Sequence, residues 1–151
     1  MPLSEASKTV LTNTLKEWTK FTVEREKITV IANELTMITR KVVQECLTFI
    51  KAQNVDIQCD SPEAMKIINV AVHIDPVIEA VFPNVKASVA LKCAGSTRAI
   101  VINPNMTISA GGTVMQLEAL KKGIPDPFVV NAADFVRDSF LYVARMGGKE
   151  E

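Results

Sequence analysis

The first third of the chain has apolar residues at helical spacing and lacks the residues that break helices. Residues 4–53 contain no glycine and no proline, whereas all six glycines and six of the seven prolines lie after residue 60. Five apolar residues fall seven positions apart, and two more fill intervening positions: Phe21, Ile28, Leu35, Val42 and Phe49, with Ile31 and Ile38. This row predicts one face of a helix of roughly 30 residues.

A second helical stretch, from about Ser4 to Lys20, comes before this row. It carries Val10, Leu11, Leu15 and Trp18, and no clear turn signal separates it from the row. The sequence therefore predicts either a helical hairpin or one long, bent helix. Nine threonines in residues 1–53 lower the intrinsic helix propensity, because a β-branched side chain loses rotamer freedom in a helix. Packing must therefore supply the stability.

The period changes to two after residue 53. Alternation predicts a short strand over 55–59 and a half-buried strand over 85–93. Turn residues at 94–97 and at Pro104-Asn105 lead into two more predicted strands, over 99–103 and 106–109. Small turn residues at 94–97 join two of these strands in a hairpin. We therefore expect a mainly antiparallel sheet of at least three strands.

Capping patterns predict three to four further helices. One opens at Ser61-Pro62, a second at Asp75-Pro76 and a third at Thr113, which has a capping-box glutamine at position 116. Pro125 and Pro127 predict an extended passage over 128–130 before a last helix that opens at Asn131. The expected class is α+β.

Length and charge exclude several classes of protein. At 151 residues we expect a single domain (1–151), with a helical segment (1–53), an α+β body (54–148) and a short tail (149–151). Basic and acidic residues are equal at 17 each, so we expect neither nucleic acid nor membrane as a partner. The N-terminus lacks a secretory pattern and no apolar run is long enough to span a bilayer, which predicts a soluble, cytoplasmic protein.

The residues that carry chemistry are few and scattered. Cys46, Cys59 and Cys93 have wide, irregular spacing, which predicts reduced, structural thiols. His73 and Asp75 lie two apart, but nothing in the sequence places a cysteine beside them for nucleophilic catalysis. We assign no catalytic residue, no metal ligand and no cofactor.

Two glycine-containing loops are candidates for ligand contact. The turn at 94–98 can aim backbone N–H groups at an anion beside Arg98, and the loop at 109–113 leads into a predicted helix N-terminus. Tight turns also explain both loops. The candidate ligand-binding residues are Gly95, Ser96, Thr97, Arg98, Gly111, Gly112 and Thr113.

The leading functional hypothesis is a non-enzymatic interaction or assembly protein. A long apolar row needs an equally long surface, which a second copy or the helix of a partner protein would supply. Packing by the rest of the same chain is the competing explanation of the row. The predicted interface comprises Trp18, Phe21, Ile28, Ile31, Leu35, Ile38, Val42 and Phe49. The alternative is a small-molecule or anion-binding protein, with enzymatic activity left open, that uses Arg98 and the two loops.

Overall fold

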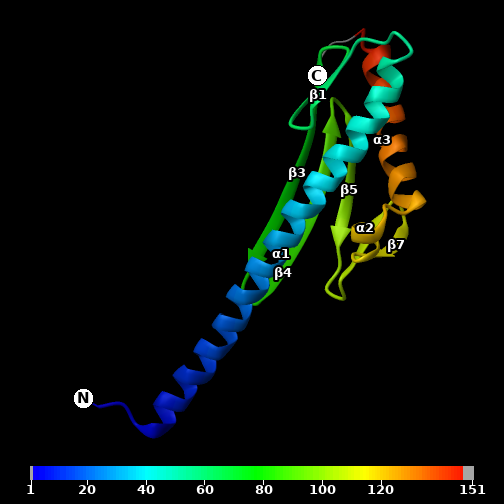
Figure 1. The fold of residues 1–151 in the computed structure, drawn as a ribbon. Coiled ribbons are helices and arrows are strands. Elements are labelled where there is room, and N and C mark those ends of the chain that lie inside the picture. The colour runs from blue at the N-terminus through cyan, green and yellow to red at the C-terminus, as the bar shows by residue number, and fades with distance from the viewer. Residues whose placement is uncertain (1, 148–151) are drawn as a thin grey trace.

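One long helix lies across a seven-stranded antiparallel sheet and extends beyond it (Figure 1). The computed structural model describes residues 2–147. The strands follow one another in space as they do in the sequence. The elements are α1 (Glu5–Lys51), β1 (Ile57–Ser61), β2 (Ala64–Ile67), β3 (Val70–Val81), β4 (Asn84–Cys93), β5 (Ser96–Ile102), β6 (Thr107–Ala110), β7 (Thr113–Gln116), α2 (Ala119–Lys122) and α3 (Asp126–Arg145). The predicted α+β class is confirmed.

The helical third is one continuous helix of 47 residues and not a hairpin. It begins at Ser4, whose side-chain oxygen accepts a hydrogen bond from the Ser7 N–H at 3.1 Å. The buried hydroxyls of Thr36 and Thr39 donate to the carbonyls of Ala32 and Leu35, each at 2.7 Å. The helix thus satisfies its own polar groups even where it is buried.

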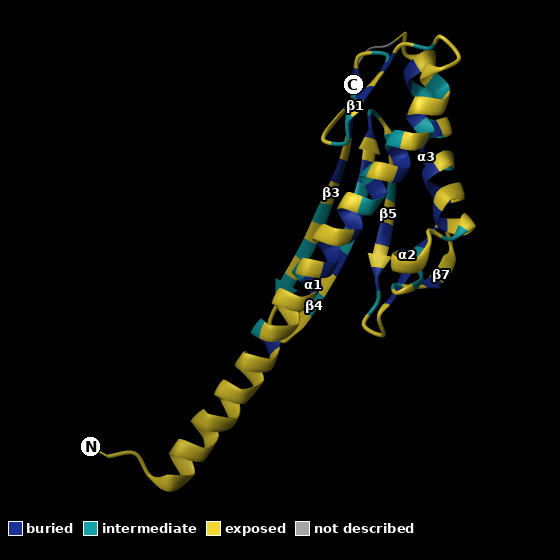
Figure 2. Ribbon diagram, in the orientation of Figure 1, coloured by how far each residue is buried: buried dark blue, intermediate teal, exposed yellow. Residues whose placement is uncertain are grey.

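The core lies between one face of the sheet and the helices α1 and α3. Leu35 and Leu47 of α1 and Phe135 of α3 are almost fully buried against the inward-facing strand residues, which include Ile67, Val89, Leu91, Ile100 and Ile108. No helix within residues 2–147 covers the opposite face of the sheet, and the residues of that face alternate with the buried ones along β3, β4 and β5 (Figure 2). This alternation is the one predicted for 85–93.

The predicted helices at Ser61 and Asp75 are wrong, because both segments are strands. The Ser61 hydroxyl does accept from the Glu63 N–H at 3.3 Å, but this bond closes the turn between β1 and β2. A two-residue turn at Ile68-Asn69, both with positive φ, then shifts the phase of the alternation. Because of that shift the buried strand residues Met65 and Val72 are seven positions apart, a spacing that also fits one face of a helix.

Pro76 lies within β3, where a proline is tolerated for a local reason. β2 pairs with β3 only through residues 70–72, so the rest of β3 has a partner on one side alone, β4. A missing N–H donor costs little on such an open edge. The proline that suggested a helix start therefore marks an edge strand.

The C-terminal elements differ from the prediction in two places. Residues 113–116 form β7, because the turn at Gly111-Gly112 returns the chain alongside β6, and only 119–122 are helical. The last helix begins at Asp126, with Pro127 in its first turn, where no backbone donor is needed. Only two helices therefore follow α1 among residues 2–147, instead of three or four.

α1 ends two residues before position 53, the predicted end of the helical segment. Lys51 is the last helical residue, and Asn54 has φ +67° before β1 begins. The predicted tail, 149–151, lies outside the described residues. Within residues 2–147, none of the helices combines the length and the apolar character needed to cross a bilayer.

Candidate interaction surface

The first four turns of α1 project beyond the rest of the molecule. Residues 5–20, called the N-terminal segment below, are all exposed, and Phe21 is the first residue of α1 that is buried (Figure 2). At 1.5 Å per residue the segment is about 24 Å long. It leaves the body, meaning the sheet with α2, α3 and the rest of α1, beside the turn between β3 and β4 (Figure 1).

Four large apolar side chains of this segment are exposed. Their exposed fractions are 63% for Val10, 50% for Leu11, 63% for Leu15 and 48% for Trp18. At 100° per residue these four side chains lie within an arc of about 140° on the helix. No charged residue between positions 4 and 22 falls in this arc, which is called the uncharged face below.

An aromatic cluster marks the point where the segment leaves the body. The ring centroids of Trp18 and Phe21 are 5.4 Å apart, and the ring of Phe82, in the turn between β3 and β4, lies 5.8 Å from the first and 5.3 Å from the second. A surface cavity of about 310 Å³ beside this cluster is lined by Glu17, Lys20, Phe21, Glu24 and Pro83. Glu17, Lys20 and Glu24 lie outside the uncharged face, so the hollow borders that face on its charged flank.

The structure divides the predicted interface residues into two groups. Phe21, Ile28, Ile31, Leu35 and Val42 are buried against the same chain, and Ile38 is half-buried there. Trp18 and Phe49 are exposed, at 48% and 71%. The body thus covers the middle of the predicted row, as the competing explanation proposed.

Sequence reasoning identified Val10, Leu11 and Leu15 as apolar helix residues but did not place them in an interface. The signal of their exposure was the length of the helix compared with the length of the strands. A helix of 47 residues spans about 70 Å, whereas β3, the longest strand with 12 residues, spans about 40 Å. A helix so much longer than the sheet must leave part of its apolar face uncovered.

The predicted ligand site around Arg98 is assembled only in part. A surface cavity of about 310 Å³ brings Arg98, Gly111 and Thr113 together with three residues of α3: Asp126, Asn131 and Asp134. Of the other candidates, Gly95, Ser96, Thr97 and Gly112 do not line it. Thr97 is exposed on β5, one position away from Arg98 and therefore on the opposite face of the sheet.

The charge of Arg98 is already matched within the chain. Its guanidinium donates to an Asp138 carboxylate oxygen at 2.9 Å and to the side-chain oxygen of Asn131 at 3.3 Å. These bonds tie β5 to α3. The hydrogen bond from Arg98, and then the one from Arg137, lowers the pKa of Asp138 below its usual value. With Asp126 and Asp134 also in the cavity wall, the local charge does not favour an anion.

The glycines of both loops have local structural roles. Gly111 and Gly112 have φ of +58° and +82° in the two-residue turn that joins β6 to β7, a conformation that favours glycine. A Cβ on Gly95 would lie 2.5 Å from the Tyr142 ring of α3. Close packing and turn geometry therefore account for these positions without a ligand.

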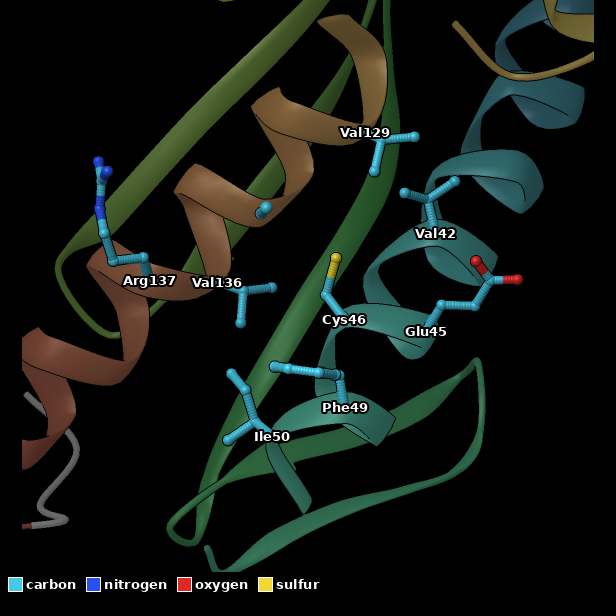
Figure 3. Close-up of a pocket in the computed structure, with 9 residues that line it drawn as sticks. Val42, Glu45, Cys46, Phe49, Ile50, Val129, Val136 and Arg137 are labelled. Atoms are coloured by element: carbon cyan, nitrogen blue, oxygen red, sulfur yellow. The ribbon is translucent and has the colours of Figure 1, made fainter. Parts of the chain in front are cut away.

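An apolar groove lies between α1 and α3 (Figure 3). It measures about 330 Å³ and is lined mainly by Val42, Cys46, Phe49, Val129 and Val136. The Cys46 thiol points into the groove (Figure 3). Burial, followed by the neighbouring Glu45 carboxylate, raises the pKa of this thiol, which makes it a poor nucleophile at neutral pH.

The remaining reactive side chains do not form a site. Cys59 and Cys93 are buried in the core, and Cys46 is half-buried. His73 and Asp75 are exposed on the outer face of β3, whereas Cys93 lies on the inner face of β4. Within residues 2–147, no group of three or more His, Cys, Asp and Glu side chains is placed to hold a metal ion.

The N-terminal segment is therefore an apolar helical surface that the body leaves uncovered. Its apolar side chains lie on one face and end at an aromatic cluster. No family model, curated protein or solved structure matches this chain at a significant level.

Proposed function

We propose that this chain is a non-enzymatic assembly protein that forms a homo-oligomer through the N-terminal segment of α1. One observation carries the proposal: Val10, Leu11 and Leu15 are exposed on the uncharged face before α1 reaches the body, and Trp18 is exposed on the same face at the edge of the body, beside Phe82. Monomeric proteins rarely expose grouped apolar side chains of this size without an interaction to cover them.

The free energy of burial supports an occupant for this face. Complete burial of a large apolar side chain is worth about 1.5–3 kcal/mol, and these side chains are already about half covered, so each gains a part of that amount. The segment also carries Thr9, Thr12, Thr14 and Thr19, which lower its helix propensity. A helix with this composition gains stability when a second surface packs on it.

A second copy of the chain fits the uncharged face better than a charged partner helix. Residues 9–15 contain no charged residue, so two copies meet there without repulsion between like charges. Closed, two-fold pairing is also the commonest assembly among soluble proteins. The segment thus serves as the assembly element, and the body is what it carries.

The test compares two variants: one has a new negative charge on the uncharged face, and the other has the same charge on the back of the helix. Leu15→Asp sets a carboxylate on the uncharged face, in place of one of its four large apolar side chains, and is expected to give a monomer on size-exclusion chromatography with in-line light scattering. Asn13→Asp, on the opposite side of the same helical turn, is expected to keep the assembly. Equal masses for the two variants would contradict the proposal.

The cavity at Arg98 supports a second, weaker candidate function, the binding of a small molecule. The observation in its favour is that one hollow brings together Arg98, Gly111 and Thr113. Its two wall carboxylates, Asp126 and Asp134, favour a neutral or cationic molecule over an anion. Titration with inorganic phosphate, followed by NMR, tests the anion version directly. A saturable chemical-shift change confined to Arg98, Gly111 and Thr113 would support anion binding there. The absence of any change would eliminate it.

A further inference from the structure

We infer that two copies pair through their N-terminal segments in antiparallel orientation, about a two-fold axis near Thr12 and Asn13. Each helix start then lies against the aromatic cluster of its partner, formed by Trp18, Phe21 and Phe82. This inference rests on the proposed assembly function and adds the orientation of the two copies and the identity of the surface at each end.

The position of the body relative to the uncharged face excludes parallel pairing on steric grounds. Phe82 packs against both Trp18 and Phe21, so the turn between β3 and β4 lies on the same side of α1 as the uncharged face. In a parallel pair, the two bodies would stand at the same end, and their β3–β4 turns would enter the same space between the helices. In an antiparallel pair, each body lies at the far end, next to the partner's helix start.

The charges at the margins of the uncharged face favour the same orientation. A parallel pair would set Lys8 beside its own copy and Arg25 beside its own copy, and like charges at such positions repel. In the antiparallel pair centred near Asn13, Leu11 lies opposite the partner's Leu15, and the Lys8 side chain lies opposite the partner's Trp18. A cation above a tryptophan ring is attracted to it.

The size of the contact also favours an interface that includes the β3–β4 turn. A stable interface buries roughly 800 Å² on each partner. Two helical segments about 24 Å long offer a narrow strip, so contact beyond the helices is required. At the partner's end, the antiparallel pair adds Val81 and Phe82, which are 76% and 44% exposed, and the cavity beside Pro83.

The residues at the start of α1 are small enough to leave room for the aromatic cluster of the partner. Positions 4, 6 and 7 are Ser4, Ala6 and Ser7, the smallest side chains of the segment and its cap. Small side chains let two backbones approach closely, which leaves room for the bulky Phe82 ring of the partner. The wide ring cluster at one end of the segment thus faces the narrow part of the helix at the other.

Cysteine cross-linking distinguishes the two orientations. Ser7→Cys and Thr22→Cys are made as separate variants in a Cys46→Ser background, because Cys46 is the one native thiol that is not fully buried. In the antiparallel pair, a thiol introduced at position 7 would lie about 18 Å along the axis from its own copy, and one at position 22 about 27 Å from its own copy. The thiols at the two different positions would be only about 5 Å apart along the axis.

We expect disulfide-linked dimers when the two variants are mixed and oxidised, and none from either variant alone. Asn13→Cys, on the back of the helix, serves as the control for chance collision and is expected to stay unlinked. Cross-linking of each single variant with itself would show parallel pairing and overturn the inference, and so would a dimer that forms no cross-link in the mixture. A monomer by light scattering would instead contradict the proposed function itself.

Discussion

The two parts of α1 both carry apolar residues at helical spacing but have different surroundings. Residues 5–20 are exposed, whereas one face of residues 21–51 forms a large part of the core. The difference lies in the sheet, which ends at the turn containing Phe82 while the helix continues. Periodicity in a sequence shows which face of a helix is apolar, and the length of the neighbouring element decides how much of that face is covered.

Polar contacts also differ between the covered part of α1 and the N-terminal segment. In the covered part, the Arg40 side chain donates to the carbonyl of Ile74 at 3.0 Å and Gln44 donates to the carbonyl of Cys59 at 2.7 Å, which fixes α1 on β3 and β1. In the N-terminal segment, the described ion pair is local and exposed, between Lys8 and Glu5 at 3.6 Å. The covered part is therefore held to the body, and the segment is free to serve another surface.

The largest expected effect comes from a buried charge in the covered part. Leu35 is 1% exposed, so Leu35→Asp buries an unpaired carboxylate and should cost about 4 kcal/mol or more of the free energy of unfolding. Leu15→Asp should leave the unfolding of the body almost unchanged. Thermal unfolding followed by circular dichroism compares the two, and similar losses would show that the division of α1 is wrong.

Truncation of a leucine to alanine should also distinguish the two parts of α1, by a smaller difference in the free energy of unfolding. Leu47 is fully buried, and Leu47→Ala should reduce the free energy of unfolding by about 2–5 kcal/mol. Leu11→Ala should change the stability of the body by no more than about 0.5 kcal/mol. Urea denaturation at concentrations where the protein is monomeric measures both. A large loss for Leu11→Ala would mean that the segment contacts its own body.

The sequence predicted the elements whose signals are local. The strands near 85–93, 99–103 and 106–109 were predicted correctly because the first alternates apolar and polar residues and the other two each follow a short turn. The helix predicted at Ser61 was wrong because a serine hydroxyl makes the same bond to a nearby N–H in a turn as at a helix start. At Asp75, the error arose because an edge strand accepts Pro76.

The candidate sites were predictable to different degrees. The loop at Gly111 and Arg98 do share a cavity, but no sequence pattern shows that the Arg98 guanidinium donates a hydrogen bond to Asp138. The apolar character of the N-terminal segment was visible in the sequence. Its exposure was not, because exposure depends on where the body ends, and that is set by the turn at Phe82, which comes much later in the chain.

Lowering the pH should destabilise the body and leave the contact between the two N-terminal segments unchanged. The folded-state pKa of Asp138 is lowered by Arg98, so its stabilisation is complete above the unfolded value of about 3.9 and is lost as the pH falls through the lower folded value. The uncharged face has no group that titrates in this range. Asp138→Asn should therefore flatten the acid side of the stability profile, and Asp56→Asn, at an exposed site, should not. Identical profiles for the wild type and Asp138→Asn would contradict this role.

The molar mass of the unmodified chain tests the central claim most directly. Light scattering is measured on the wild-type protein over a series of micromolar concentrations. Pairing through the N-terminal segment predicts twice the chain mass of 16.5 kDa at the upper end of the series, with a fall toward 16.5 kDa on dilution. A mass of 16.5 kDa at every concentration would contradict the account and leave the N-terminal segment without the partner proposed for it.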